Sequence, residues 1–217
     1  MPSIDWNRSA WPEQFAAHDS KKSIYGYEWG DPNNREILMH VRDRFILPYV
    51  NRERTALEIG PGGGRWSQFL TGFRKLYLVD LNECFFESLK QRYPGDNVVC
   101  LRTNGSDLAG IEDGSLNFIF SFGAFVHIDP ADIEGYLDSI KRKLAAGGVV
   151  ALHYSDKTKP LGLKEAVFSY NTPDLMRSLV RHHGFSIAEE DLTTLPHSSI
   201  IRFCHGPASV EESGTGS

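Results

Sequence analysis

The sequence predicts an α/β protein whose mostly parallel, doubly wound sheet has about seven strands and carries an N-terminal helical lid. Two observations predict it. From Thr55 onward, short β-branched and aromatic runs alternate with amphipathic stretches, which is typical of parallel strands joined by helical crossovers. The last two runs are separated only by TTLPH, which favours an antiparallel hairpin at one sheet edge.

The expected strands are apolar, β-branched and aromatic, as suits strands buried on both faces of a parallel sheet. In chain order we expect them at residues 55–60, 75–81, 98–103, 115–122, 147–154, 185–192 and 198–205.

Helices are expected between these strands, at residues 65–73, 82–93, 129–148 and 172–184. The third has Asp129 as a natural N-cap, Pro130 in its first turn and Gly147 where the helix closes. The fourth has Thr172 as its cap and Gly184 at its end.

The first 54 residues are rich in Trp, Tyr and charge, and they contain one good helical stretch at 34–50. They are too short to bury a core. We therefore predict a helical cap at 1–54, a sheet domain at 55–206 and a disordered tail at 207–217, which has nothing to pack.

Composition excludes several classes of protein. With 41% hydrophobic and 24% charged residues, neither disorder nor a fibrous repeat is expected. No apolar run is long enough for a membrane span and the start lacks a secretory pattern, which favours a soluble, cytoplasmic protein. The net charge of −5 and the lack of a basic stripe argue against nucleic acid. The three cysteines and eight histidines show no metal-ligand spacing, so no metal is expected.

The segment LEIGPGGG, residues 57–64, carries the main functional signal. Gly60, Gly62 and Gly64 follow a buried strand and precede an expected helix. Glycines let the backbone approach a ligand closely, and a helix start offers free N–H groups. A purely structural turn is the alternative interpretation.

Two acidic residues frame this loop, Glu58 before it and Asp80 at the end of the second strand. A carboxylate at the Asp80 position can accept both ribose hydroxyls of a nucleotide. The dinucleotide fingerprint, however, places its third glycine one residue later, and an acid before the loop repels a diphosphate but suits an ammonium. The pattern therefore points away from NAD.

These residues resemble the class I S-adenosylmethionine-dependent methyltransferases, over roughly residues 55–154. The E-x-G-x-G-x-G loop of that family matches Glu58 and the three glycines, and its second-strand acid matches Asp80. Its third acid most closely matches Asp107, with Asn104 and Gly105 as alternatives.

The resemblance implies a Rossmann-like seven-stranded sheet with a reversed final hairpin and S-adenosyl-L-methionine as the cofactor. The cofactor-binding residues that it implies are Glu58, Gly60, Pro61, Gly62, Gly64, Asp80, Leu81, Asp107, Leu108 and Ser121.

Each of the acids has an alternative explanation. Glu58 can pair with a nearby arginine such as Arg65. Asp80 can cap the following helix, which does not exclude ribose binding. Asp107 can satisfy its own backbone in a turn.

His127 is the candidate general base, because it leaves the fourth strand at its carboxyl end, where ligands of open α/β sheets bind. The alternative is that His127 only packs near the cofactor.

The acceptor pocket has five candidate residues. His153 and Tyr154 end the fifth strand, where neighbouring side chains normally face opposite ways. Tyr25, Tyr27 and Trp29 crowd before a Gly-Asp-Pro turn; their faces can stabilise a sulfonium or simply staple the cap onto the core.

The predicted function is methyl transfer from S-adenosyl-L-methionine to an oxygen or nitrogen of a small-molecule or sugar-like acceptor. The alternatives are a nicotinamide-dependent oxidoreductase and a non-catalytic binding module that keeps the cofactor fold.

Overall fold

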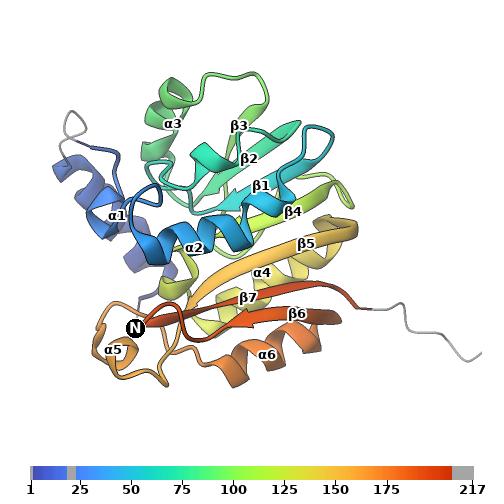
Figure 1. Cartoon of the computed structure of the whole chain (residues 1–217). Coiled ribbons are helices and arrows are strands. Elements are labelled where there is room, and N and C mark those ends of the chain that lie inside the picture. The colour runs from blue at the N-terminus through green and yellow to red at the C-terminus, as the bar shows by residue number, and fades with distance from the viewer. Residues whose placement is uncertain (1, 19–22, 207–217) are drawn as a thin grey trace, which may run out of the picture.

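The computed structural model describes residues 2–18 and 23–206 and contains one seven-stranded sheet in the order β3-β2-β1-β4-β5-β7-β6 (Figure 1). All neighbouring pairs are parallel except β5–β7 and β6–β7. The predicted parallel sheet with a reversed last strand is confirmed. The tail predicted at 207–217 lies outside the described residues. The strands are β1 Thr55–Ile59, β2 Lys75–Asp80, β3 Val98–Arg102, β4 Leu116–Ser121, β5 Leu144–Ser155, β6 Phe185–Asp191 and β7 Ser198–His205.

Helices cover both faces of this sheet (Figure 1). They are α1 Ile4–Ala17, α2 Glu36–Phe45, α3 Phe86–Arg92, α4 Pro130–Lys143, α5 Pro160–Lys164 and α6 Pro173–His182. Single 3-10 turns lie at Tyr27–Trp29, Leu47–Tyr49, Ser67–Phe69, Glu83–Phe85 and Phe125–His127. None of the described helices combines the length and the apolar character needed to cross a membrane.

The side-chain alternation of the strands divides the apolar interior into two cores. Ile119 of β4 faces the core that contains α4 and α6, whereas Phe118 and Phe120 face the core that contains α2 and α3. Because successive strand residues point to opposite faces, every strand except β6 contributes to both cores. This explains why the strand segments are apolar almost throughout.

Two predicted helices differ from the structure. The stretch 65–73 forms only a 3-10 turn at Ser67–Phe69. The helix predicted at 129–148 ends at Lys143, because β5 begins at Leu144 and pairs there with Leu116 of β4. Gly147, with φ of +70°, therefore lies inside a strand rather than at a helix end.

Helix α1 is the element that the sequence did not predict. Its N-cap is Ser3, whose side chain accepts a hydrogen bond from the Trp6 N–H. Pro12 inside the helix and the lack of a clear apolar stripe conceal it in the sequence.

Asn7 fastens α1 to the rest of the molecule. Its Nδ2 donates to the backbone oxygen of His127 at 2.9 Å, and its Oδ1 accepts from Trp11 Nε1 at 2.8 Å. The Asn7 backbone oxygen accepts from Asn82 Nδ2 at 3.1 Å. Only 8% of Asn7 is exposed, so these bonds are shielded from water and hold α1 against the loops after β2 and β4.

We expect Asn7→Ala to loosen α1 while leaving the sheet intact, because it removes two side-chain hydrogen bonds of about 0.5–1.5 kcal/mol each. Amide hydrogen exchange over residues 4–17 should accelerate about 5- to 150-fold. Ser9→Ala, an exposed position on the same helix, is the control. Equal exchange rates in the two variants would contradict the fastening role of Asn7.

Candidate functional site

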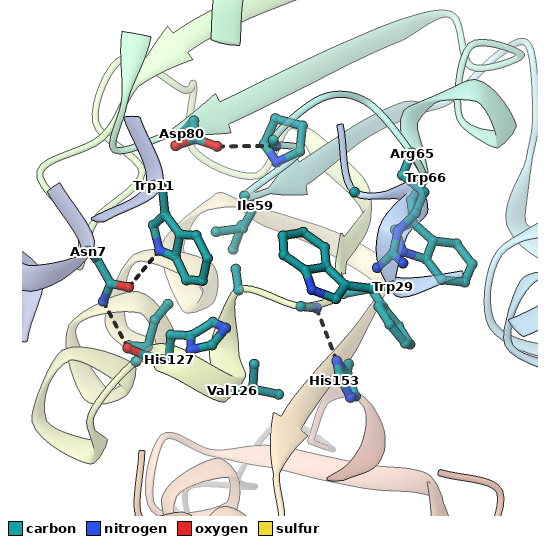
Figure 2. A pocket seen from close by; sticks show the side chains of 18 of the residues that line it. Asn7, Trp11, Trp29, Ile59, Arg65, Trp66, Asp80, Val126, His127 and His153 are labelled. Carbon is teal, nitrogen blue, oxygen red and sulfur yellow. Dashed lines mark hydrogen bonds between the residues drawn. The ribbon is translucent and has the colours of Figure 1, made fainter. Parts of the chain in front are cut away.

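A cavity of about 510 Å³ lies at the carboxyl ends of the central strands. Its floor comes from the segments after β1, β2 and β4, which contribute Gly60, Asp80 and Phe122 among others. Its cover comes from α1 and the turn that contains Trp29 (Figure 2). Ligands of open α/β sheets bind at this edge, so the cavity is the candidate functional site.

The glycines of the loop after β1 have different physical roles, although all three have positive φ. A Cβ on Gly60 would lie 2.5 Å from Ala124 Cβ, and one on Gly64 would lie 2.8 Å from the Tyr93 ring. Gly62 faces the cavity, with the Tyr25 ring 3.8 Å from its would-be Cβ. Gly60, Pro61 and Gly62 therefore line the cavity, whereas Gly64 serves packing.

Asp80 brings a carboxylate into the cavity at the end of β2. It accepts hydrogen bonds from the backbone N–H groups of Asn82, at 2.9 Å, and of Gly62, at 3.3 Å (Figure 2). Burial raises the pKa of Asp80, and the backbone hydrogen bonds lower it. Burial is the larger effect, so the pKa is about 6. The group is mainly ionised at neutral pH, and Leu81 lines the cavity beside it.

Glu58 lies behind the loop rather than in the cavity. It is 1% exposed, and its carboxyl accepts a hydrogen bond from Ser67 Oγ at 2.5 Å. Burial raises its pKa to about 8, and Ser67 and Arg65 only partly offset this. Glu58 is therefore largely protonated at neutral pH and supports the loop. We expected its carboxylate beside a ligand ammonium, but in the structure its side chain lies outside the cavity lining.

Three further predicted cofactor residues lie outside the cavity lining. The Asp107 carboxylate accepts from the Asn104 backbone N–H at 3.5 Å, in line with the alternative explanation of a turn, and from Thr103 Oγ1 at 3.2 Å. Leu108 is buried in the core. Ser121 Oγ donates to the Ile59 backbone oxygen at 2.8 Å. Of the candidates for the adenine, Gly105 lines the cavity.

His127 lies in the cavity wall next to the cover. Its Nδ1 lies 2.7 Å from the Val167 backbone oxygen, which can only accept, so Nδ1 carries the proton. The ring centroid is 4.6 Å from that of Trp11 and 5.4 Å from that of Phe168. Burial lowers the pKa of His127 to about 4, so at neutral pH its Nε2 has a free lone pair.

Two of the three predicted N-terminal aromatics line the cavity. Tyr25 is buried and Trp29 is 47% exposed, with the two ring centroids 5.5 Å apart. Figure 2 shows Trp29 and Trp11 facing the same space as His127. Tyr27 lies outside the lining, where its hydroxyl accepts from Gln68 Nε2 at 3.1 Å.

Strand alternation separates the two candidates at the end of β5. His153 lines the cavity, stacked on Phe122 at 3.9 Å between centroids, whereas Tyr154 is fully buried in the opposite core. The prediction that Tyr154 contacts an acceptor is therefore wrong. Both nitrogens of His153 are engaged, by Gly123 N–H at 3.0 Å and by Ser198 Oγ at 2.6 Å.

Several cavity residues were absent from the predicted site. Trp11 comes from the unpredicted α1, and Phe168 and His197 come from the long loops after β5 and β6. Arg65 was considered only as a partner for Glu58. No sequence pattern marks loop residues of this kind, because their approach to the cavity depends on how the loops fold back over the sheet.

We expect the buried carboxyl of Glu58 to make stability depend on pH. Its folded-state pKa of about 8 exceeds its ordinary value of 4.5, so its contribution is fully present below pH 4.5 and is lost as pH rises to about 8. The free energy of unfolding of Glu58→Gln should match that of wild type at pH 5 and exceed it at pH 9 by roughly 2–4 kcal/mol.

Urea denaturation at several pH values measures this difference, with the exposed Glu134→Gln as the control for losing a carboxylate. If the free energies of unfolding of wild type and Glu58→Gln stay parallel from pH 6 to 9, Glu58 is not a protonated buried group.

Comparison with known proteins agrees with this geometry. Residues 57–152 match the family model described as "Methyltransferase domain". No curated protein sequence matches the chain.

Solved structures share the fold. A complex of DhpI with SAH has a TM-score of 0.68 at 18% identity, covering 94% of this chain and 97% of that one. The PH0226 protein from Pyrococcus horikoshii OT3 has a TM-score of 0.66 at 16% identity, covering 82% and 95%. An S-adenosylmethionine-dependent methyltransferase from Mesorhizobium loti has a TM-score of 0.66 at 13% identity, and the match covers 79% of this chain and 99% of that one.

The matched model, the strand order and the glycine loop with its second-strand acid are mutually consistent. Residues 57–152 are thus similar to a methyltransferase domain, and the chain shares the fold of the solved structures above.

Proposed function

We propose that this protein transfers the methyl group of S-adenosyl-L-methionine to an oxygen or nitrogen of a small-molecule acceptor. The proposal rests on two features of one cavity. In one part, the ionised carboxylate of Asp80 lies beside the glycine loop; in another, the neutral imidazole of His127 lies among aromatic rings. The net charge of −5 favours a small acceptor over a nucleic acid, and we expect the protein to act in the cytoplasm.

The residues present fit this cofactor. The loop at Gly62 leaves room for close approach by a ligand, and Asp80 has lone pairs left for two ribose hydroxyls after its two backbone bonds. Trp11 and Trp29 offer aromatic faces that favour a cation by about 0.5–2 kcal/mol. When bound, S-adenosyl-L-methionine supplies a methyl group on a positively charged sulfur.

His127 is suited to accept a proton from the acceptor. The Val167 carbonyl fixes its Nδ1 as a donor, which leaves Nε2 as the acceptor, and burial keeps the ring neutral at pH 7. A base of low pKa removes a proton only as the acceptor oxygen or nitrogen becomes acidic during bond formation. The main contribution of the chain is then orientation of the acceptor, worth roughly 7–11 kcal/mol when well aligned.

Thermal-shift measurements with S-adenosylhomocysteine and with NAD test the proposed function directly. S-adenosylhomocysteine should raise Tm and NAD should not. Stabilisation by NAD alone would overturn the proposal. Binding of S-adenosylhomocysteine without transfer of labelled methyl to any acceptor in an extract would instead favour a non-catalytic binding module.

We expect Asp80→Ala to weaken the binding of S-adenosylhomocysteine by roughly 1.5–3 kcal/mol, about 10- to 150-fold in Kd, because hydrogen bonds to a charged group are lost. Isothermal titration calorimetry measures the change. Asp107→Ala, outside the cavity lining, is the matched control and should leave Kd within twofold. If Asp107→Ala weakens binding and Asp80→Ala does not, the adenosine contacts Asp107 instead.

We expect His127→Ala to reduce kcat by about 10²- to 10⁴-fold, the usual contribution of a general base, with little change in the affinity for S-adenosylhomocysteine. His182→Ala, at an exposed position of α6, controls for the loss of an imidazole. Retained turnover in His127→Ala would leave this residue a packing role only.

A further inference from the structure

We propose that the acceptor carries a carboxylate or a comparable oxyanion, which binds in the cavity between Arg65 and His197. This inference rests on the proposed function, because it names the substrate class for the same site.

Arg65 is a buried cation that lines the cavity and lacks an ionic partner. It is 8% exposed, and its one hydrogen bond runs from Nη1 to the Gly30 backbone oxygen at 3.2 Å. Within residues 2–18 and 23–206 it forms no ion pair. A guanidinium has five N–H donors, and buried charges are normally paired. Arg65 is therefore short of an anion.

Glu28 and Glu58 are the carboxylates whose charge acts on Arg65, and neither forms an ion pair with it. Glu28 is exposed, and its side chain accepts a hydrogen bond from the Gly26 N–H at 2.7 Å. Glu58 is largely protonated and bonded to Ser67. Burial lowers the pKa of Arg65 to about 10, so its side chain still carries a full charge at neutral pH.

His197 presents a fixed hydrogen-bond donor to the same cavity. The Gly123 N–H can only donate, so Nδ1 of His153 accepts and its proton lies on Nε2, 2.6 Å from Ser198 Oγ. The Ser198 hydroxyl then donates to His197 Nδ1 at 2.8 Å. Burial lowers the pKa of both histidines, so His197 is neutral with its remaining proton on Nε2.

His127 and His197 therefore have opposite hydrogen-bonding character. Nε2 of His127 is an acceptor, whereas Nε2 of His197 is a donor. Phe168 lies between them, with its ring centroid 5.4 Å from that of His127 and 5.5 Å from that of His197. A donor at His197 and a cation at Arg65 suit an oxyanion, while the lone pair of His127 is left for the atom that is methylated.

The sheet order separates His197 from the ribose end of the cavity. Asp80 ends β2, whereas His197 precedes β7, with β1, β4 and β5 between those strands. Phe122, at the end of β4, contacts Arg65 on one side, with Cζ 5.7 Å from the ring centroid, and stacks on His153. Arg35 adds a second guanidinium to the lining. Arg65 thus lies against the Phe122 ring, whose stacking partner His153 is linked through Ser198 to His197.

The test compares matched pairs of small hydroxy acids and their amides, such as 4-hydroxybenzoate and 4-hydroxybenzamide, as ligands in the presence of saturating S-adenosylhomocysteine. Ligand-observed NMR titration gives the affinities. Wild type should bind acids at least tenfold more tightly than their amides. Arg65→Gln should reduce this preference below about threefold and leave the Kd for S-adenosylhomocysteine within twofold. Arg65→Lys, which keeps the charge, should retain part of the preference.

Three results would overturn the proposal. In the first, wild type binds amides as tightly as acids, a comparison that needs no variant to fold. In the second, S-adenosylhomocysteine binds but none of the acids does. In the third, Arg65→Gln weakens S-adenosylhomocysteine but not its decarboxylated analogue, which would pair Arg65 with the carboxylate of the cofactor. Failure of S-adenosylhomocysteine to bind wild type would instead refute the proposed function.

Discussion

The close contact between the loop after β1 and the segment after β4 is the constraint on which the cavity depends. It is possible because Gly60 has no side chain, so its backbone lies where a Cβ would come within 2.5 Å of Ala124 Cβ. The positive φ of Gly60 and Gly62 turns the chain back over the sheet edge. The ends of two parallel strands thereby form one continuous floor for a ligand.

Burial then assigns a charge state to each ionisable group around that floor. Desolvation keeps Glu58 and His127 largely neutral at neutral pH, whereas Asp80 and Arg65 stay charged. The result is a cavity whose lining holds an anion, Asp80, and a cation, Arg65. A zwitterionic arrangement of this kind selects ligands by the position of their charges as well as by shape.

The N-terminal segment completes the site rather than merely covering it. Asn7 ties α1 to the loops after β2 and β4, and Trp11 lies against His127. Removal of water by these aromatic rings strengthens every electrostatic interaction inside the cavity. The division of the chain into a cap at 1–54 and a sheet domain at 55–206 stays a prediction.

Local patterns were sufficient to predict the seven strands and the helix that Thr172 caps, because strand periodicity and helix caps are read from neighbouring residues. They also indicated that Asp80 and His127 lie at the carboxyl edge of the sheet, where both line the cavity. Long-range contacts decided the rest. The partner of Arg65 is Gly30, 35 residues away, and the direction of the His197 hydrogen bond depends on His153, which bonds Ser198 across two strands. Even the short-range contact of Glu58 with Ser67 forms only because the loop between them folds back. Burial and hydrogen-bond direction are properties of the packed structure, and no local pattern encodes them.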